Sequence, residues 1–175
     1  MYAGLVSRLG TLILTLIVPV LAPAAPATGA MAPAFRLQDQ HDAWVSLADQ
    51  RGSWLVLYFY PLDDSPGCTA EACEFRDNIF AFRKLGVNLL GISVQDVASK
   101  KEFAARYHLP FPVLADKDKS VARAYGVLGI LGFARRETFV VDPQGRIAKH
   151  YASVDPKEHS RQLLQDLRAL IKPAA

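Results

Sequence analysis

The sequence predicts one α/β domain, in which a central mixed β-sheet is flanked by helices and preceded by a β-hairpin. Short apolar runs alternate with amphipathic segments from Phe35 onward. No repeat, low-complexity tract or second linker interrupts this alternation. With 51% hydrophobic residues, 21% charged residues and two cysteines among 175 residues, the chain is neither disordered nor a small disulfide-stapled protein.

The first elements are expected to be a hairpin and a buried strand. Short β-prone segments at 35–37 and 43–47 surround the turn-rich segment 38–42, which indicates a small β-hairpin. The run 54–60 is apolar at odd and even positions alike, as in a central strand that is buried on both faces. Pro61 ends that strand.

A long helix and a second central strand follow. The helix is predicted by one apolar face at helical spacing, made of Cys68, Ala72, Phe75, Ile79 and Phe82. Gly86 ends it. Residues 87–94 indicate the second central strand, and residues 98–108 a second helix.

The remaining elements are short, and the last is a helix. The pattern predicts strand 111–114, helix 120–125, strand 137–141 and, after a turn at 142–145, a returning strand 146–151. Asp155 is the expected N-cap of the last helix, with Pro156 as its first residue and Glu158 completing the cap. Its docking face is expected to be Leu163, Leu167, Leu170 and Ile171. A β-α-β half followed by a hairpin and a terminal helix is the element order of the thioredoxin fold.

Residues 1–30 have the pattern of a secretory signal peptide. Arg8 is their only charged residue, and it precedes an apolar run at 9–20. That run is shorter than the roughly 20 residues needed to span a bilayer. We therefore expect an exported, periplasmic or secreted protein whose domain is 31–175, with an uncleaved membrane anchor as the alternative. The candidate cleavage points follow Ala25, Ala27 and Ala30.

Charge and histidine spacing exclude two classes of function. The net charge is +3 and like charges form no run, so no nucleic-acid partner is indicated. The histidines lack the i, i+3 or i, i+4 spacing of a helical metal site; they are His41, His108, His150 and His159.

Cys68 lies where a loop becomes a helix behind a buried strand. A thiol there meets the free N–H groups and the positive end of the helix dipole, which stabilise thiolate over thiol. The nearby acids Asp63 and Asp64 would oppose this effect if they faced the sulfur. A nearby arginine is therefore expected in the folded site.

The position of Cys73 argues against a permanent disulfide. Five residues along an ideal helix separate two Cα atoms by roughly 8.6 Å, whereas a disulfide allows no more than about 6.8 Å. Bridging Cys68 and Cys73 therefore requires the first turns of the helix to unwind. A nucleophilic thiol and a resolving thiol fit this geometry better than a static bridge.

Residues 58–77 read Tyr-Phe-Tyr-Pro-Leu-Asp-Asp-Ser-Pro-Gly-Cys-Thr-Ala-Glu-Ala-Cys-Glu-Phe-Arg-Asp. This stretch strongly resembles the peroxiredoxins of the alkyl hydroperoxide reductase/thiol-specific antioxidant superfamily. Within them it is similar to the bacterioferritin-comigratory, or peroxiredoxin Q, group. The resemblance continues through 109–116, 124–127 and 136–142.

The resemblance implies roles for particular residues. The family pattern Pro-x-x-x-Thr/Ser-x-x-Cys is matched by Pro61, Ser65 and Cys68, which implies peroxide binding by the first two and a peroxidatic role for the cysteine. Cys73 matches the resolving cysteine of the subgroup that forms its disulfide within one chain.

An arginine of the family is matched as well. Arg136, two residues before Thr138, would supply the cation that the thiolate and the peroxide oxygens need. Arg135 competes for this place, and only one of the two neighbours can point into the site.

The implied activity is that of a thiol-dependent peroxidase. Cys68 would attack hydrogen peroxide or an alkyl hydroperoxide and become a sulfenic acid, Cys73 would condense with it, and an external thioredoxin-like dithiol would reduce the disulfide. No metal or organic cofactor is implied, and we expect a monomer. One alternative is an exported thiol:disulfide oxidoreductase, which the absence of Cys-x-x-Cys disfavours. The other is a non-catalytic thioredoxin-fold binding domain with a structural disulfide.

Overall fold

A computed structural model describes residues 24–171. Its strands are β1 (Arg36–Gln38), β2 (Trp44–Ser46), β3 (Trp54–Phe59), β4 (Val87–Ser93), β5 (Val113–Ala115), β6 (Glu137–Val141) and β7 (Ile147–Tyr151). Its α-helices are α1 (Pro66–Lys84), α2 (Val97–Tyr107), α3 (Ser120–Ala124) and α4 (His159–Ile171), and a 3-10 turn covers Ala48–Gln50. No helix within 24–171 is long and apolar enough to cross a membrane.

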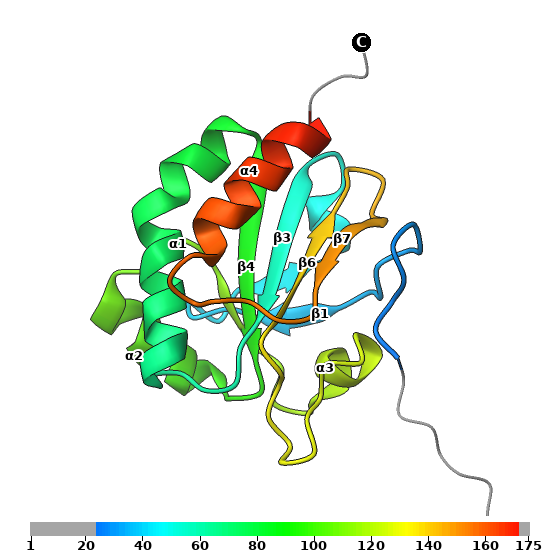
Figure 1. The fold of residues 1–175 in the computed structure, drawn as a ribbon. Coiled ribbons are helices and arrows are strands. Elements are labelled where there is room, and N and C mark those ends of the chain that lie inside the picture. The colour runs from blue at the N-terminus through cyan, green and yellow to red at the C-terminus, as the bar shows by residue number, and fades with distance from the viewer. Residues whose placement is uncertain (1–23, 172–175) are drawn as a thin grey trace, which may run out of the picture.

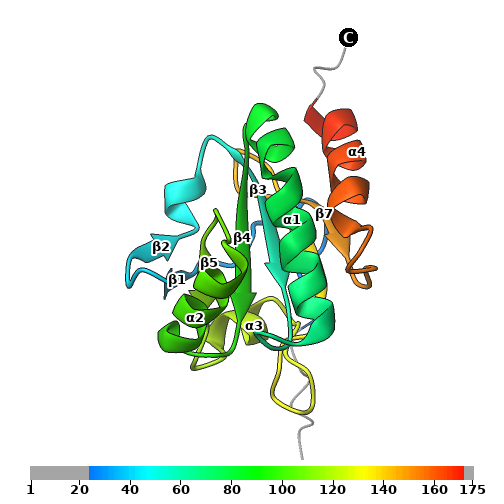
Figure 2. The same cartoon turned by 90° about the vertical axis from the view of Figure 1, so that its left-hand side faces the viewer.

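One mixed sheet organises these elements, as predicted. Its strand order is β2-β1-β5-β4-β3-β6-β7. The central strand β3 runs parallel to β4 and antiparallel to β6, and β4 runs parallel to β5. The β1–β2 hairpin lies at one edge of the sheet and β7 at the other (Figure 2). The expectation of a mixed sheet flanked by helices, with an N-terminal hairpin, is therefore confirmed.

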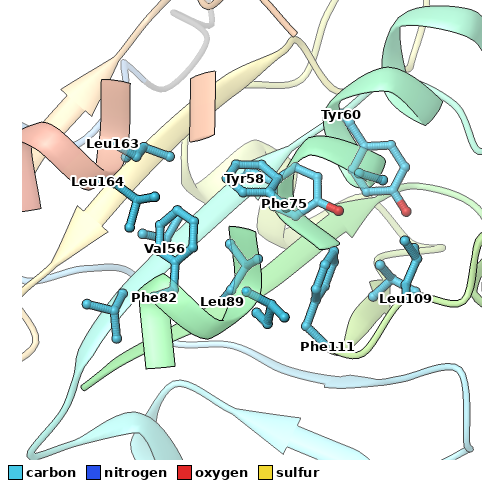
Figure 3. Packing of buried hydrophobic residues seen from close by; sticks show 14 of the residues in the cluster. Val56, Tyr58, Tyr60, Phe75, Phe82, Leu89, Leu109, Phe111, Leu163 and Leu164 are labelled. Atoms are coloured by element: carbon cyan, nitrogen blue, oxygen red, sulfur yellow. The ribbon is translucent and has the colours of Figure 1, made fainter. Parts of the chain in front are cut away.

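The strand β3 supplies both layers of the core. Val56, Tyr58 and the following Tyr60 point to the face that α1, α2 and α4 cover (Figure 3). The alternate residues 55, 57 and 59 point to the other face, which packs on the segment around α3 and on the chain before β1. This placement explains why the run 54–60 is apolar at odd and even positions alike.

A glycine in β4 makes room for one of these aromatic rings. A Cβ atom on Gly91 would lie 2.6 Å from the Tyr58 hydroxyl oxygen, so no side chain fits at this position. The Tyr58 ring then packs on Phe75 of α1, with ring centroids 4.7 Å apart. This contact helps to fix α1, the helix that carries both cysteines, against β3.

The last helix starts later than predicted. Asp155 caps a turn rather than α4 itself: its side chain accepts from the Lys157 N–H, and its carbonyl accepts from the N–H groups of Glu158 and His159. The regular helix begins at His159 and lies beside α1 (Figure 1). Its face differs too, because Leu164 is buried whereas Leu170 is exposed. Capping residues identify a turn, and tertiary packing decides where the regular helix begins.

Residues before the predicted domain boundary take part in the fold. The Gly29 N–H donates to the Ile147 carbonyl over 2.8 Å, and the Ile147 N–H donates to the Ala30 carbonyl over 2.9 Å. Ala25 packs against the core on the α3 side of the sheet. Most of the predicted signal peptide, residues 1–23, lies outside the described residues.

These contacts predict the effect of trimming the N-terminus. A chain that begins at Met31 loses both backbone hydrogen bonds to Ile147, and each such bond contributes about 0.5–1.5 kcal/mol. Its free energy of unfolding should therefore be about 1–3 kcal/mol below that of a chain that begins at Ala24. Urea unfolding followed by circular dichroism measures the difference, and equal midpoints for the two chains would contradict the assigned contacts.

Candidate active site

The thiol of Cys68 is buried at the N-terminal end of α1. Ser65 is the N-cap of this helix in an extended conformation, Pro66 is its first residue and Cys68 is its third. Proline suits the first position because the N–H that it lacks would have no partner within the helix. The side chain of Cys68 is only 1% exposed. The backbone therefore presents the thiol to the free N–H groups and the positive dipole end of α1.

An arginine from another element reaches the sulfur. The Arg136 Nη2 atom donates to Cys68 Sγ over 3.2 Å. Arg136 immediately precedes β6, whose antiparallel pairing with β3 brings it next to the strand that leads to Cys68. Its side chain is 19% exposed, against 52% for Arg135, which instead donates to Glu137. Of the two neighbours, it is therefore Arg136 that enters the site.

A glycine and a glutamate with no predicted role complete this arrangement. A Cβ atom on Gly67 would lie 3.1 Å from Arg136 Nη2, so the absence of a side chain there lets the guanidinium approach. Glu71 is 1% exposed, and its Oε2 atom accepts a hydrogen bond from Arg136 Nη1. The sequence signal that points to Glu71 is its spacing of three residues from Cys68, because residues three apart on a helix lie on the same face.

Burial and charge act in opposite directions on this ion pair. Burial raises the pKa of Glu71 to about 7, although the charge of Arg136 acts to lower it. Burial would lower the pKa of Arg136, but its interactions with Glu71 and Cys68, which include hydrogen bonds to both, raise it overall. The guanidinium is therefore held as a cation between a carboxyl group and the thiol.

Ser65 lies at the site but does not point at the sulfur. Its Oγ donates to the Leu62 carbonyl over 3.2 Å and caps no helix N–H. Pro61 follows β3 and begins the same loop, which ends at α1. Pro61 and Ser65 of the predicted motif thus lie on the loop between β3 and α1, and Cys68 lies in the first turn of α1.

Cys73 lies further along α1 and is not joined to Cys68. Both cysteines are free, and Cys73 is partly exposed. The helix is continuous from Pro66 to Lys84, so the two Cα atoms are separated by roughly the 8.6 Å expected from helix geometry. A bond between them requires this part of α1 to unwind.

The two acids near Cys68 are both paired with cations. Asp63 is buried and lies 2.9 Å from Lys100 Nζ. Asp64 lies 3.0 Å from Arg106 Nη1. The expected arginine next to the sulfur is thus Arg136. The two aspartates are paired instead with two residues of α2, Lys100 and Arg106.

Comparison with known proteins identifies the family. The AhpC/TSA family matches residues 28–150. Peroxiredoxin Q, chloroplastic, from Arabidopsis thaliana is 42% identical over 144 residues, which cover 81% of this chain and 67% of that protein. Peroxiredoxin Bcp from Bacillus subtilis is 36% identical over 147 residues, which cover 80% of this chain and 94% of that protein.

Solved structures agree with these relatives. A Xanthomonas campestris bacterioferritin comigratory protein, studied for its alkyl peroxide reduction activity, superposes with a TM-score of 0.75 at 31% identity. The match covers 79% of this chain and 92% of that structure. The thioredoxin-like fold expected from the order of the elements is therefore confirmed.

The relatives contradict the predicted location. The Arabidopsis protein is named chloroplastic, and neither its name nor that of the Bacillus protein describes an exported enzyme. The prediction of an exported, periplasmic, secreted or membrane-anchored protein is wrong by this comparison. An apolar run followed by small residues reports local hydrophobicity, which by itself does not determine the compartment of a protein.

The matches extend over most of the chain and include the stretch that holds both cysteines. The buried thiol beside an arginine is the chemistry that a thiol peroxidase needs. The chain belongs to the AhpC/TSA family and, within it, to the peroxiredoxin Q/Bcp peroxiredoxins, which are thiol-dependent peroxidases.

Proposed function

We propose that Cys68 is the peroxidatic cysteine and that Cys73 resolves its sulfenic acid within the same chain. The observation that carries this proposal is the 3.2 Å contact between Arg136 Nη2 and the buried Cys68 Sγ at the start of α1. A guanidinium and a helix N-terminus both favour thiolate over thiol. The thiolate is the form of cysteine that attacks peroxide.

The first step is an in-line displacement at a peroxide oxygen. The Cys68 thiolate forms an S–O bond as the O–O bond breaks, which gives a sulfenic acid and leaves hydroxide or alkoxide. That leaving group takes a proton and departs as water or alcohol. Arg136 and the N–H groups of α1 stabilise the negative charge that builds up on the departing oxygen. The Ser65 hydroxyl, now bonded to the Leu62 carbonyl, can rotate to bond the peroxide.

The second step needs a change of conformation. Cys73 attacks the Cys68 sulfenic acid, and water leaves as the disulfide forms. The first turns of α1 unwind to bring the two sulfur atoms together, because the helical spacing exceeds the disulfide limit. The residues just beyond Cys73 stay tied to α4: the Ser160 Oγ donates to Glu74 Oε2 over 2.9 Å, and Asn78 donates to the Ser160 Oγ over 3.0 Å.

The third step regenerates the thiols. A thioredoxin-like dithiol attacks the disulfide, leaves as its own disulfide and returns both cysteines to the reduced form. We propose hydrogen peroxide and alkyl hydroperoxides as substrates, the latter supported by the activity described for the Xanthomonas relative. We also propose that the chain acts as a monomer, because Cys68, Cys73 and Arg136 all come from one chain.

The chain divides, in this proposal, into an N-terminal segment and the peroxiredoxin domain. We propose that residues 31–175 form the main part of the peroxiredoxin domain, that residues 25–30 belong to it through their contacts with Ile147 and the core, and that the segment before them is removable. The match of the family to residues 28–150 supports a start near this boundary. Mass spectrometry of the protein isolated from its own cells tests the proposal, and a mature chain that still begins at Met1 would overturn it.

Glu71 makes the folded state sensitive to pH. Its Oε1 atom is buried without a hydrogen-bond partner among the described residues, which penalises the charged form of the carboxyl group. The folded state therefore holds the Glu71 proton more tightly than the unfolded state, whose pKa is near the ordinary 4.5. Between pH 4.5 and about 7 the unfolded chain binds fewer protons, so stability falls as pH rises.

Substitution of the two cysteines should separate the first two steps. Cys68→Ser should abolish peroxide consumption in the presence of a dithiol, because the nucleophile is gone. Cys73→Ser should react once with peroxide and accumulate sulfenic acid on Cys68, since no internal thiol resolves it. Mass spectrometry after trapping with dimedone measures this product. Full activity of Cys68→Ser would refute the proposed role.

Glu71→Gln should remove one pH dependence of stability. The free energy of unfolding of the native protein should fall by about 3 kcal/mol relative to the variant between pH 4.5 and pH 7.5, the equivalent of the raised pKa. Urea unfolding of both reduced proteins at the two pH values measures this difference, and the other titrating groups cancel in the comparison. Parallel pH profiles for the two proteins would show that Glu71 is already ionised in this range.

A further inference from the structure

A lysine that takes no part in the proposed chemistry lies buried near the active site. Lys100, in the first turn of α2, is fully buried, with 0% exposure. Its Nζ atom lies 3.0 and 2.9 Å from the two carboxylate oxygens of Asp63, and it also donates to the Ser93 hydroxyl. Burial lowers the pKa of Lys100, and the charge of Asp63 partly offsets that effect.

Asp63 belongs to the loop that leads into α1. Its carboxylate also accepts from the Tyr60 hydroxyl over 2.7 Å and from the Ser99 hydroxyl over 2.5 Å. Its backbone N–H donates to Gln95 Oε1 over 2.5 Å. One residue of the catalytic loop is thereby bonded to the end of β3, to the segment after β4 and to the first turn of α2.

Stability alone gives little reason for this ion pair. Taking two charges out of water costs several kcal/mol per ion, and replacing a buried pair by apolar residues of similar volume is often neutral or stabilising. What the pair does supply is a fixed orientation of the Asp63 carboxylate, because three donors hold it: the Tyr60 hydroxyl after β3, and the Ser99 hydroxyl and Lys100 Nζ of α2. Asp63 lies two residues before Ser65 and five before Cys68.

We infer that Lys100 is a positioning residue for the peroxidase reaction, which acts by holding Asp63 and so fixing the loop from Pro61 to Ser65 relative to Cys68. The inference rests on the proposed function. Ser65 and the first N–H groups of α1 contact the peroxide in that proposal, whereas Lys100 is bonded to the loop only through Asp63. Lys100 therefore governs where the peroxide is held, and Arg136 governs the charge on the sulfur.

The test compares two reactions of the same thiol. The rate of sulfenic acid formation with hydrogen peroxide depends on peroxide positioning, whereas alkylation by iodoacetamide reports only on the access and nucleophilicity of Cys68. All proteins are full-length and carry Cys73→Ser, so that a single thiol reacts. The decisive variant is Asp63→Asn with Lys100→Met, because removal of one partner alone would leave an unpaired buried charge and destabilise the fold.

A second lysine–aspartate pair, which is partly exposed, supplies the control. Lys149 of β7 lies 2.7 Å from Asp166 Oδ2 of α4, and the Tyr151 hydroxyl donates to the same oxygen. The two lysines lie over their tyrosine rings at similar distances, 4.9 Å for Lys149 and 5.2 Å for Lys100. The control variant is therefore Asp166→Asn with Lys149→Met.

The expected result is selective loss of the peroxide reaction. In the Asp63/Lys100 variant the peroxide rate should fall by about ten- to a hundredfold, the size of effect that a misplacement of about 1 Å produces. Its alkylation rate should stay within about threefold of the parent, and both rates of the control should be unchanged. A peroxide rate within twofold of the parent, or an equal fall in both rates, would overturn the inference. If the parent itself forms no sulfenic acid, the proposed function fails instead.

Discussion

The site depends on keeping a thiol buried and still able to ionise. A thiolate taken out of water needs a compensating charge, and in this protein the charge comes from Arg136, 3.2 Å from the sulfur of Cys68. Other features follow from that need. The pairing of β6 with β3 places the arginine next to the site, Gly67 leaves room for its guanidinium, and Glu71 accepts a hydrogen bond from Nη1, the terminal nitrogen that does not bond the sulfur.

The helix α1, which carries both cysteines, must be stable in one step of the reaction and must unwind in the next. Its apolar face packs Phe75 and Phe82 into the core, while the cysteines lie at positions that a regular helix keeps apart. The firm contacts lie on either side of the segment that moves. Asp63 is bonded to α2 ahead of it, and Glu74 is bonded to α4 beyond it. The segment that must rearrange is therefore short, and the core beneath it can remain folded.

Much of the fold could be predicted because its signals are local. The two-sided apolar run of β3 and the helical spacing of α1 are both periodic patterns, and the structure has both elements nearly where they were expected. The regular helix α4 begins later than the sequence predicts, because Asp155 has the chemistry of a cap but caps only a turn. For the arginine of the site, the sequence leaves two neighbours, Arg135 and Arg136. It does not reveal the roles of Gly67, Glu71 and Lys100, because these depend on partners far away in the chain.

The sequence by itself determined the α/β class, the central strands and the chemistry around Cys68. A cysteine at the start of a helix meets the free N–H groups and the positive dipole end of that helix, and both depend on the local backbone alone. Only the tertiary structure decided that Arg136 rather than Arg135 faces the sulfur, and that Asp63 is paired with Lys100. The reason is physical: a helix or a turn is set by neighbours along the chain, whereas burial and ion pairing are set by segments that meet only after the chain has folded.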